Sequence, residues 1–271
     1  MIAGGVVLAG GRSSRMGTSK ALLEWHGSTL LRRVVGLVQR GVDGPVVVVA
    51  AADQELPPLP AAVDVVHDAR PGRGPLAGIA VGLTFLGDQV DAAFVCATDM
   101  PLLTPSLVRR IVRQLGAADI ALPQVDGFDQ PLGAAYRTHL GKHAEVLLEE
   151  GQGRVALLQQ DAAVVRLDHA ALRQPTGLRG MNDPATYAEL RALPAPRVVV
   201  HRTGALARPT TTDTPHMTVH AATLGAAAVA VGLARDRHLL AAIGGDAVVR
   251  DPDTPLAEGD EVSFLSADAG G

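Results

Sequence analysis

The sequence predicts a doubly wound α/β domain followed by a small α+β domain, and three observations support this prediction. Short β-branched runs alternate with longer helical segments up to about residue 190. Residues 193–196, Leu-Pro-Ala-Pro, then have the composition of a short stiff linker. After them, short strand-like runs surround one alanine-rich helical segment. We therefore expect two domains, residues 1–193 and 197–271, the first a doubly wound, Rossmann-like fold and the second a small α+β domain.

Five runs in the first part have the composition of buried parallel strands, because they are apolar and are bounded by Gly, Pro or Asp. They are residues 6–8, 46–49, 63–66, 92–96 and 119–122. Helices are expected between or after them at residues 20–40, 78–87, 105–115 and 141–150. Ligands of such sheets bind at the carboxyl ends of the strands, so the loops that follow these runs are where we expect chemistry.

The second part is expected to contain five strands and one helix. The strands are expected at residues 197–201, 217–220, 238–243, 247–250 and 261–265, and the helix at residues 221–233. A unit of this size and pattern is typical of a small α+β domain.

Composition and charge narrow the function classes. The chain has 24 Lys and Arg against 28 Asp and Glu, a net charge of −4, which argues against nucleic acid as a partner. Its apolar runs are well short of the roughly 20 residues that cross a bilayer, so we expect no membrane segment. Cys96 is the single cysteine and cannot form an internal disulfide, and a cytoplasmic location fits best.

The loop after the first strand has the features of a polyphosphate cradle. Gly10 and Gly11 allow close backbone approach to an anion, and three cations, Arg12, Arg15 and Lys20, precede the first carboxylate of the chain. The pattern is neither a Walker A motif nor G-x-G-x-x-G. The alternative is a glycine-rich turn with solvated arginines.

A second glycine cluster follows the run at residues 63–66. It begins at Asp68, includes Gly74 and again places arginines beside glycines at the start of a helix. Two such loops on neighbouring strand ends could face one ligand, although a plain turn explains this cluster equally well.

Asp99 follows the apolar run at residues 92–96. A carboxylate at the end of a buried strand suits Mg²⁺, which prefers oxygen ligands. The alternative is that Asp99 caps the helix that starts near Pro105. Cys96 is expected to pack in the core. Two histidine pairs at a spacing of four have no third ligand in the sequence pattern, so we expect surface or packing roles for them, not a metal site; they are His139 with His143 and His216 with His220.

Taken together, these strings resemble the molybdenum cofactor guanylyltransferases over nearly all of residues 1–190. The resemblance is carried, in order, by LAGGRSSRMGTSKALL, GPLAGI, TDMP, QPLGAAYR and the late Asn182-Asp183-Pro184. It implies a nucleotidyltransferase that uses Mg²⁺, GTP and molybdopterin. In that reading the first loop and Lys20 bind the phosphates, Asp99 holds the metal, and Lys20, Asp99 and Arg15 are catalytic.

The same resemblance assigns the remaining nucleotide contacts. Leu8, Ala9 and Gly11 would frame the base and ribose, with Gly10, Arg12 and Gly74 in the same nucleotide site, and Asp68 would contact the guanine or ribose. Asp183 either adds a carboxylate to the metal or caps the last helix of the domain, and we favour the cap. No side-chain nucleophile is needed, because the acceptor phosphate is already an oxyanion. The alternatives are transfer from CTP, another phosphorylated acceptor, and a scaffold that only binds nucleotide.

The last part resembles the ubiquitin-like sulfur carriers, namely the small subunit of molybdopterin synthase and the thiamine sulfur carrier. The resemblance is carried by IGGDAVV, by residues 254–265 and by Gly270-Gly271, and covers about residues 197–271. It implies a β-grasp domain whose terminal glycines enter an adenylating enzyme and then the large subunit of molybdopterin synthase. The alternative is a vestigial domain with a flexible tail.

Overall fold

The computed structural model describes residues 1–10, 19–68, 72–203, 206, 216–233, 239–245 and 248–266. The chain divides into two compact units. The first unit consists of Met1–Leu23 and Thr29–Tyr187, and the second of Glu24–Ser28 and Ala188–Gly271. The division therefore falls inside helix α6 (Pro184–Arg191), several residues before the Pro-x-Pro segment at which the sequence suggests a boundary. A short segment from the first part of the chain, residues 24–28, packs with the second unit.

An eight-stranded sheet forms the centre of the first unit, in the order β10-β7-β9-β6-β1-β4-β5, with β8 paired to β7. The strands are β1 (Ala3–Leu8), β4 (Val46–Ala51), β5 (Val63–Asp68), β6 (Ala92–Ala97), β7 (Ile120–Val125), β8 (Phe128–Asp129), β9 (Ala134–Arg137) and β10 (Val164–Leu167). Strands β1, β4, β5 and β6 are parallel to one another, whereas β9 runs antiparallel between β6 and β7. The expected strands are all present, and β8, β9 and β10 add to them. The expectation that residues 63–66 are buried is wrong, because β5 is the edge strand of the sheet and its positions are exposed or intermediate.

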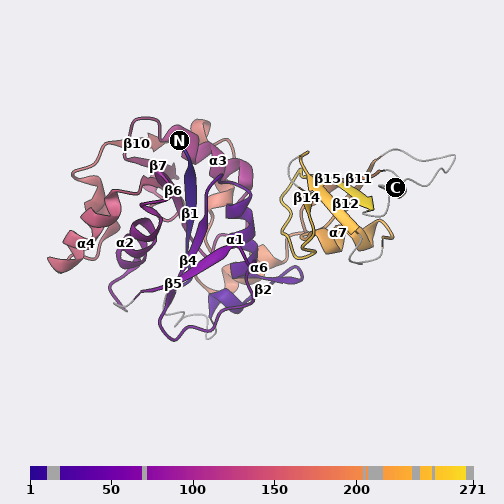
Figure 1. Ribbon diagram of the computed structural model, residues 1–271, viewed down its shortest axis with the longest axis horizontal. Coiled ribbons are helices and arrows are strands. Elements are labelled where there is room, and N and C mark those ends of the chain that lie inside the picture. The colour runs from indigo at the N-terminus through magenta and orange to yellow at the C-terminus, as the bar shows by residue number, and fades with distance from the viewer. Residues whose placement is uncertain are drawn as a thin grey trace. The chain divides into compact units, whose positions relative to one another are not determined.

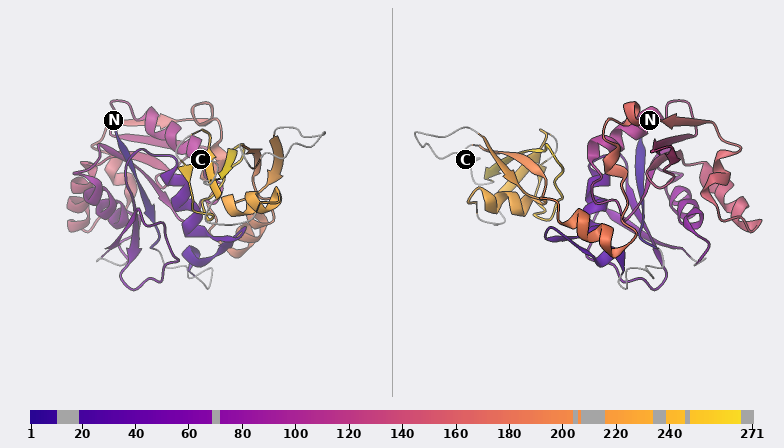
Figure 2. Two further views of the ribbon diagram at one scale, coloured as in Figure 1. Left: turned by 45° about the vertical axis from the view of Figure 1, so that its right-hand side comes forward. Right: turned by 180° about the vertical axis from the view of Figure 1, so that it is seen from behind.

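Helices cover both faces of this sheet. Helices α1 (Leu30–Gln39) and α3 (Pro105–Gln114) lie on one face, and α2 (Pro75–Leu86) and α4 (Leu140–Glu149) on the other (Figure 1). The view from behind in Figure 2 shows helices on both sides of the central strands. Burial on both faces explains why β1 is apolar along its whole length. At Gly82 of α2, an added Cβ would lie 2.4 Å from Val6 Cγ1, so glycine permits the close approach of α2 to β1.

The remaining described helices of the first unit are short. They are the 3₁₀ turns η1 (Lys20–Leu22), η2 (Val155–Gln159) and η3 (Pro175–Leu178), and the single-turn helix α5 (His169–Leu172).

The expectation of one helix over residues 20–40 is wrong. After η1 the chain forms a two-stranded hairpin of β2 (Glu24–Trp25) and β3 (Ser28–Thr29), and α1 begins only at Leu30. The turn contains His26 and Gly27, whose φ angles are 46° and 88°. Two consecutive residues in the left-handed region form a tight hairpin turn and cannot continue a right-handed helix.

The second unit contains a five-stranded sheet in the order β12-β11-β15-β13-β14. Its strands are β11 (Arg197–Arg202), β12 (His216–His220), β13 (Leu239–Ile243), β14 (Val248–Val249) and β15 (Glu261–Ser266). Strands β11 and β15 are parallel, and the other pairs are antiparallel. Helix α7 (Leu224–Ala230) lies between β12 and β13 in the sequence and packs on a core that includes Val200, Val262 and Phe264.

Helix α7 is shorter than the expected 221–233. Thr223 has an extended backbone, and its hydroxyl accepts a hydrogen bond from Ala226 N, so the helix begins after it. Gly232, at φ 75°, follows the end of the helix.

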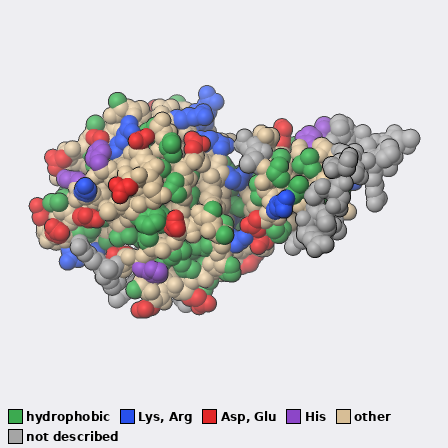
Figure 3. All heavy atoms as spheres, viewed as in Figure 1, with side chains coloured by type: hydrophobic (Ala, Val, Ile, Leu, Met, Phe, Trp, Pro, Cys, Tyr) green, Lys and Arg blue, Asp and Glu red, His purple; other side chains and the backbone are tan. Residues whose placement is uncertain are grey.

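The surface and the helix lengths add two observations. On the face of the first unit seen in Figure 3, acidic and basic side chains are interspersed. Within the described ranges, none of the helices has both the length and the apolar composition needed to span a membrane.

Candidate active site

The parallel strands of the first unit bring the predicted site residues to one edge of the sheet. β1 lies between β6 and β4, and the chain turns from one side of β1 to the other when it enters β6. At such a switch point the carboxyl ends of the strands leave a crevice for a ligand. Ala9 and Gly10 follow β1, Asp68 ends β5, and Asp99 follows β6, so all four residues lie at this edge.

Three side chains from distant parts of the sequence meet there. Lys20 Nζ donates a hydrogen bond to Asp99 Oδ2 at 2.8 Å and another to Asn182 Oδ1 at 2.8 Å. The Lys20 and Asp99 side chains are 20% and 14% exposed, so this ion pair is largely withdrawn from water. Lys20 and Asp99 are expected from the sequence in one nucleotide site, on the phosphates and the metal respectively, and the structure brings their side chains together. Asn182 is not among the expected site residues.

The backbone around Asp99 is held by the strands beneath it. Thr98 Oγ1 donates to Leu8 O at 3.0 Å, which ties the end of β6 to the end of β1. Met181 N donates to Asp99 O at 3.0 Å, which brings the 180–182 segment to the same edge. An added Cβ at Gly180 would lie 3.5 Å from Asp99 Oδ1, so this glycine leaves room beside the carboxylate. The carboxylate is therefore fixed in place but not enclosed.

The buried arginine Arg33 of α1 supports the same loop. It is only 4% exposed, and its Nε donates to Pro101 O at 2.8 Å. This contact secures the chain two residues after Asp99.

The capping alternatives for the two aspartates are resolved in opposite ways. Asp99 does not cap α3, because the N-cap is Thr104, whose hydroxyl accepts a hydrogen bond from Leu107 N. Asp183 is a cap, since its carboxylate accepts hydrogen bonds from the backbone N and the hydroxyl of Thr186, both at 2.8 Å. The carboxylate of Asp183 is thus used at the start of α6.

The end of β1 is tied to its neighbour. Ala9 N and Gly10 N both donate to Val49 O, at 2.9 and 3.3 Å, and Gln54 Nε2 donates to Ala9 O. These two N–H groups therefore serve the sheet, and a phosphate cradle would have to be built from the residues that follow. Gly11, Arg12 and Arg15, which the sequence analysis assigned to that cradle, lie outside the described residues.

The second glycine cluster reaches the same edge from farther away. The expectation that the two loops follow neighbouring strands is wrong, because β4 separates β1 from β5. Asp68 is half-buried and pairs in register with Ala51 of β4. Gly74, at φ 76°, is the exposed N-cap of α2, where a side chain would be strained. Both residues remain candidates for the nucleotide site.

Among the described residues, the Lys20 cluster is formed by lysine, aspartate and asparagine side chains, without cysteine or histidine. Cys96 is fully buried in β6, and burial, followed by the charge of Asp99, raises the pKa of its thiol far above the ordinary value, as expected for a core residue. Within the part of the chain that the structure describes, no three His, Cys, Asp or Glu side chains are grouped to hold a metal ion.

The donor set at Lys20 nevertheless fits a magnesium ion. Asp99 Oδ2 and Asn182 Oδ1 converge on a single cationic atom, so they already form a position for positive charge. Both are oxygen ligands, which Mg²⁺ prefers, and Mg²⁺ usually completes its shell with water and substrate phosphates. The two oxygens therefore fit a Mg²⁺ ion whose remaining ligands are water and phosphate oxygens.

Comparison with known proteins identifies the family of the first part of the chain. Residues 5–165 match the MobA-like NTP transferase domain, which is more than half of the chain. The chain belongs to the MobA-like NTP transferase family. A probable molybdenum cofactor guanylyltransferase of Mycobacterium tuberculosis is 39% identical over 179 residues, which cover 64% of this chain and 87% of that protein. The corresponding protein of Mycobacterium marinum is 39% identical over 168 residues, covering 60% and 82%.

Solved structures show the fold of the part of this MobA-like chain that they match. Molybdopterin-guanine dinucleotide biosynthesis protein A from Archaeoglobus fulgidus aligns with a TM-score of 0.57 at 19% identity, over 69% of this chain and 96% of that one. A 2-C-methyl-D-erythritol 4-phosphate cytidylyltransferase from Thermus thermophilus aligns with a TM-score of 0.52 at 18% identity, over 69% and 97%. The predictions of a Rossmann-like nucleotidyltransferase fold and of a nucleotidyltransferase enzyme are confirmed.

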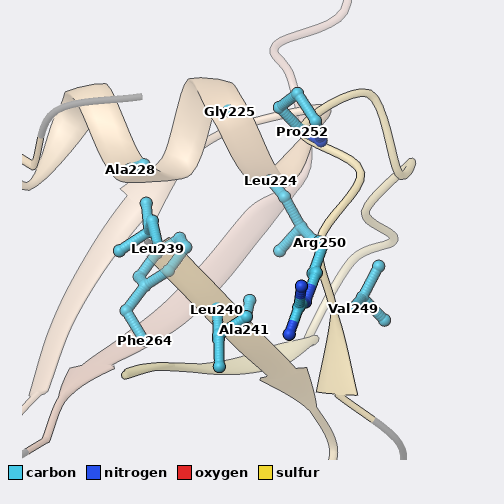
Figure 4. Close-up of a pocket in the computed structure, with 10 residues that line it drawn as sticks. All are labelled: Leu224, Gly225, Ala228, Leu239, Leu240, Ala241, Val249, Arg250, Pro252 and Phe264. Carbon is cyan, nitrogen blue, oxygen red and sulfur yellow. The ribbon is translucent and has the colours of Figure 1, made fainter. Parts of the chain in front are cut away.

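The second unit contains an apolar pocket of its own. Leu224, Gly225 and Ala228 of α7 face Leu239 and Phe264 across it, and Figure 4 shows the Arg250 side chain beside them. All its lining residues belong to the second unit, whereas the ionic cluster at Lys20 belongs to the first. Gly270 and Gly271 lie outside the described residues.

Proposed function

We propose that the first unit transfers GMP from GTP to molybdopterin, with release of pyrophosphate. The observation that carries this proposal is the cluster of Lys20, Asp99 and Asn182 at the switch point of a nucleotidyltransferase sheet. The relatives named as molybdenum cofactor guanylyltransferases support the choice of nucleotide and acceptor.

The chemistry follows from charge. The acceptor phosphate and the α-phosphate of GTP are both anions, so their approach must be offset by positive charge. Asp99 and Asn182 would hold Mg²⁺, which when bound neutralises phosphate charge and orients the leaving pyrophosphate. Lys20, with Arg12 and Arg15 of the loop before it, would bind the triphosphate. The nucleophile is an oxygen of the acceptor, so the protein needs only to align and to stabilise charge.

The base and ribose of the nucleotide would lie over the strand ends, away from the residues that bind the triphosphate. Leu8 ends β1 and is followed by Ala9 and Gly10, whereas Asp68 ends β5 and Gly74 is the N-cap of α2. Asp68 is the half-buried carboxylate that we assign to the guanine or the ribose.

A nucleotide panel tests this proposal. The full chain is incubated with molybdopterin, Mg²⁺ and either GTP or CTP, and pyrophosphate release is measured. We expect release with GTP and little with CTP. Turnover with CTP alone would identify a cytidylyltransferase, an outcome that the fold allows because a cytidylyltransferase is among its structural neighbours. Nucleotide binding without turnover would leave a scaffold.

For the second unit we infer a β-grasp domain that acts as, or derives from, a sulfur carrier. The strand order β12-β11-β15-β13-β14, with parallel β11 and β15 at its centre and one helix after the first hairpin, supports this fold. The sulfur chemistry is assigned to Gly270 and Gly271 from the sequence resemblance.

Intact mass spectrometry tests the carrier. The full chain is incubated with an adenylating enzyme of molybdenum cofactor synthesis, ATP and a sulfur donor. The expected product carries one oxygen-to-sulfur exchange at the Gly271 carboxylate, and a variant without Gly271 is the control. An unchanged mass, with a known carrier converted in the same mixture, would contradict the carrier role.

A further inference from the structure

The ion pair at the centre of the site joins Lys20 and Asp99, although the proposed function assigns a different ligand to each of them. Asp99 is assigned to the metal ion and Lys20 to the triphosphate, yet Lys20 Nζ lies 2.8 Å from both Asp99 Oδ2 and Asn182 Oδ1. We propose that, in the protein without nucleotide, the Lys20 ammonium occupies the position of the divalent cation, so that metal and nucleotide bind together. This inference rests on the metal site of the proposed function and adds its order of filling.

The two oxygens are the fixed partners in this exchange. Asp99 is tied to β1 through the neighbouring Thr98, and its backbone oxygen accepts a hydrogen bond from Met181 N. Met181 is fully buried and directly precedes Asn182, so the amide is carried by an anchored segment. The Lys20 ammonium, by contrast, is at the end of a flexible four-carbon stem. The ammonium can therefore leave without moving the oxygens.

The balance of charge determines when the Lys20 ammonium leaves the two oxygens. The Lys20 and Asp99 side chains are mostly buried, so salt and water screen their attraction less than at an exposed pair. A divalent cation that arrives first must displace a positive charge and then lie beside it. A triphosphate supplies a new anionic partner for the ammonium and leaves the two oxygens to the metal.

Thermodynamic linkage makes this coupling mutual. If the nucleotide raises the affinity for the metal by displacing Lys20, the metal raises the affinity for the nucleotide by the same factor. Removal of the ammonium should break the coupling, because the oxygens are then available before the nucleotide binds.

Binding of Mn²⁺ to the full chain, followed by the electron paramagnetic resonance signal of free Mn²⁺, tests the proposal without reference to activity. Lys20→Met removes the charge and keeps most of the side-chain length. The matched control is Lys142→Met, which changes the other lysine of the chain, exposed on α4. Each protein is titrated without nucleotide and with a GTP analogue whose α–β bridge is a methylene group.

The expected result has three parts. Without nucleotide, Lys20→Met binds Mn²⁺ at least tenfold more tightly than the wild type and Lys142→Met. The analogue tightens Mn²⁺ binding to the wild type at least tenfold, and the gain is smaller in Lys20→Met. Adding Asp99→Asn to Lys20→Met abolishes the tight binding, which assigns the ion to this position.

Two results would overturn the proposal. One is a Mn²⁺ affinity of Lys20→Met, without nucleotide, that equals the affinity of the wild type. The other is tight binding that survives Asp99→Asn, because the ion would then be elsewhere. Failure of the proposed function would give a different result. Pyrophosphate release would then be absent from the nucleotide panel, but the difference in Mn²⁺ affinity between Lys20→Met and the wild type would remain.

Discussion

The sheets of the two units differ in how far their faces are exposed to water. In the first unit, β1 is buried at every position, because helices cover both faces of the sheet. In the second unit, β11 and β15 alternate between buried and more exposed positions, as in a sheet with one covered face. When helices cover both faces of a sheet, a ligand can reach it only at the strand ends, and the Lys20 site lies there. A sheet with one uncovered face can also be reached across that face.

The ion pairs of the two units differ in the same way. Lys20 and Asp99 are 79 residues apart, 20% and 14% exposed, and bonded at 2.8 Å. In the second unit, Arg197 and Glu258 are 67% and 61% exposed and 3.6 Å apart. An exposed pair of that kind contributes little to stability. The Lys20 pair thus differs from this surface ion pair in its burial and in its shared partner Asn182.

The largest effect should come from the buried pair. Asp99→Asn keeps the size of the side chain but removes its charge, and we expect the rate of GMP transfer to fall by roughly a thousandfold. Pyrophosphate release measures the loss, and circular dichroism checks that the fold is retained. Asp64→Asn, at an exposed position of β5, is the matched control and should keep its activity. Wild-type turnover by Asp99→Asn would remove this residue from the mechanism.

A core substitution in the second unit tests whether the two units serve separate functions. Phe264 is 1% exposed on β15, and Phe264→Ala should cost the second unit about 3–5 kcal/mol, because it leaves a cavity under α7. Calorimetry should show the loss in the transition of that unit. The rate of GMP transfer at moderate temperature should stay within twofold, and a parallel loss of activity would show that the transferase depends on the second unit.

Two equivalent helix caps give a smaller and more exact comparison. Thr104 accepts a hydrogen bond from Leu107 N at the start of α3, and Thr223 accepts one from Ala226 N at the start of α7. Replacement of either threonine by alanine should cost about 1 kcal/mol. Urea unfolding followed for each transition should assign Thr104→Ala to the first unit and Thr223→Ala to the second. Loss from the other transition in either variant would contradict the division between the units.

The smallest expected effect concerns the Glu24–Arg191 pair, bonded at 2.6 Å within the second unit. Partial burial acts to raise the pKa of Glu24, but hydrogen bonds from Arg191 and Gly27 N and the charge of Arg191 outweigh it and lower the pKa from 4.5. A lowered pKa in the folded state means that the contribution is present above pH 4.5 and is lost as the pH falls through the folded value.

Because the pair is half exposed, its contribution at neutral pH should be below about 1 kcal/mol. Urea unfolding of the wild type and of Glu24→Gln at several pH values measures it. The difference between the two proteins should shrink in acid, and a difference that grows as the pH falls would contradict the assignment.

Sequence patterns predicted the first sheet well where strands are buried on both faces. The runs that became β1, β4 and β6 are apolar over most of their length, and such runs are recognisable without knowledge of their neighbours. Strand β9 was not predicted, because four residues that pair antiparallel between β6 and β7 depend on contacts distant in the sequence. The prediction of a single helix over residues 20–40 was wrong because it overlooked a local signal, the pair His26-Gly27, which forms a hairpin turn.

The candidate site was predicted in part for the same reason. Lys20 and Asp99 each stand in a recognisable local string, after a glycine-rich loop and after a buried strand. Asn182 contacts Lys20, from which it is separated by 162 positions in the sequence, and local residue spacing cannot predict such a contact. Its string, Asn182-Asp183-Pro184, draws attention to the carboxylate, which caps a helix, whereas the amide beside it faces the lysine.

The hairpin that interrupts the expected helix also carries the only tryptophan of the chain. Trp25 is 2% exposed, its ring meets the edge of the His26 ring at a centroid distance of 5.5 Å, and the segment packs with the second unit. Tryptophan fluorescence of this protein therefore arises from one indole, located in a hairpin of the first part of the sequence that groups with the second unit. Excitation at a wavelength that tyrosine does not absorb excludes Tyr136 of β9, so the tryptophan signal follows the hairpin separately from the sheet of the first unit.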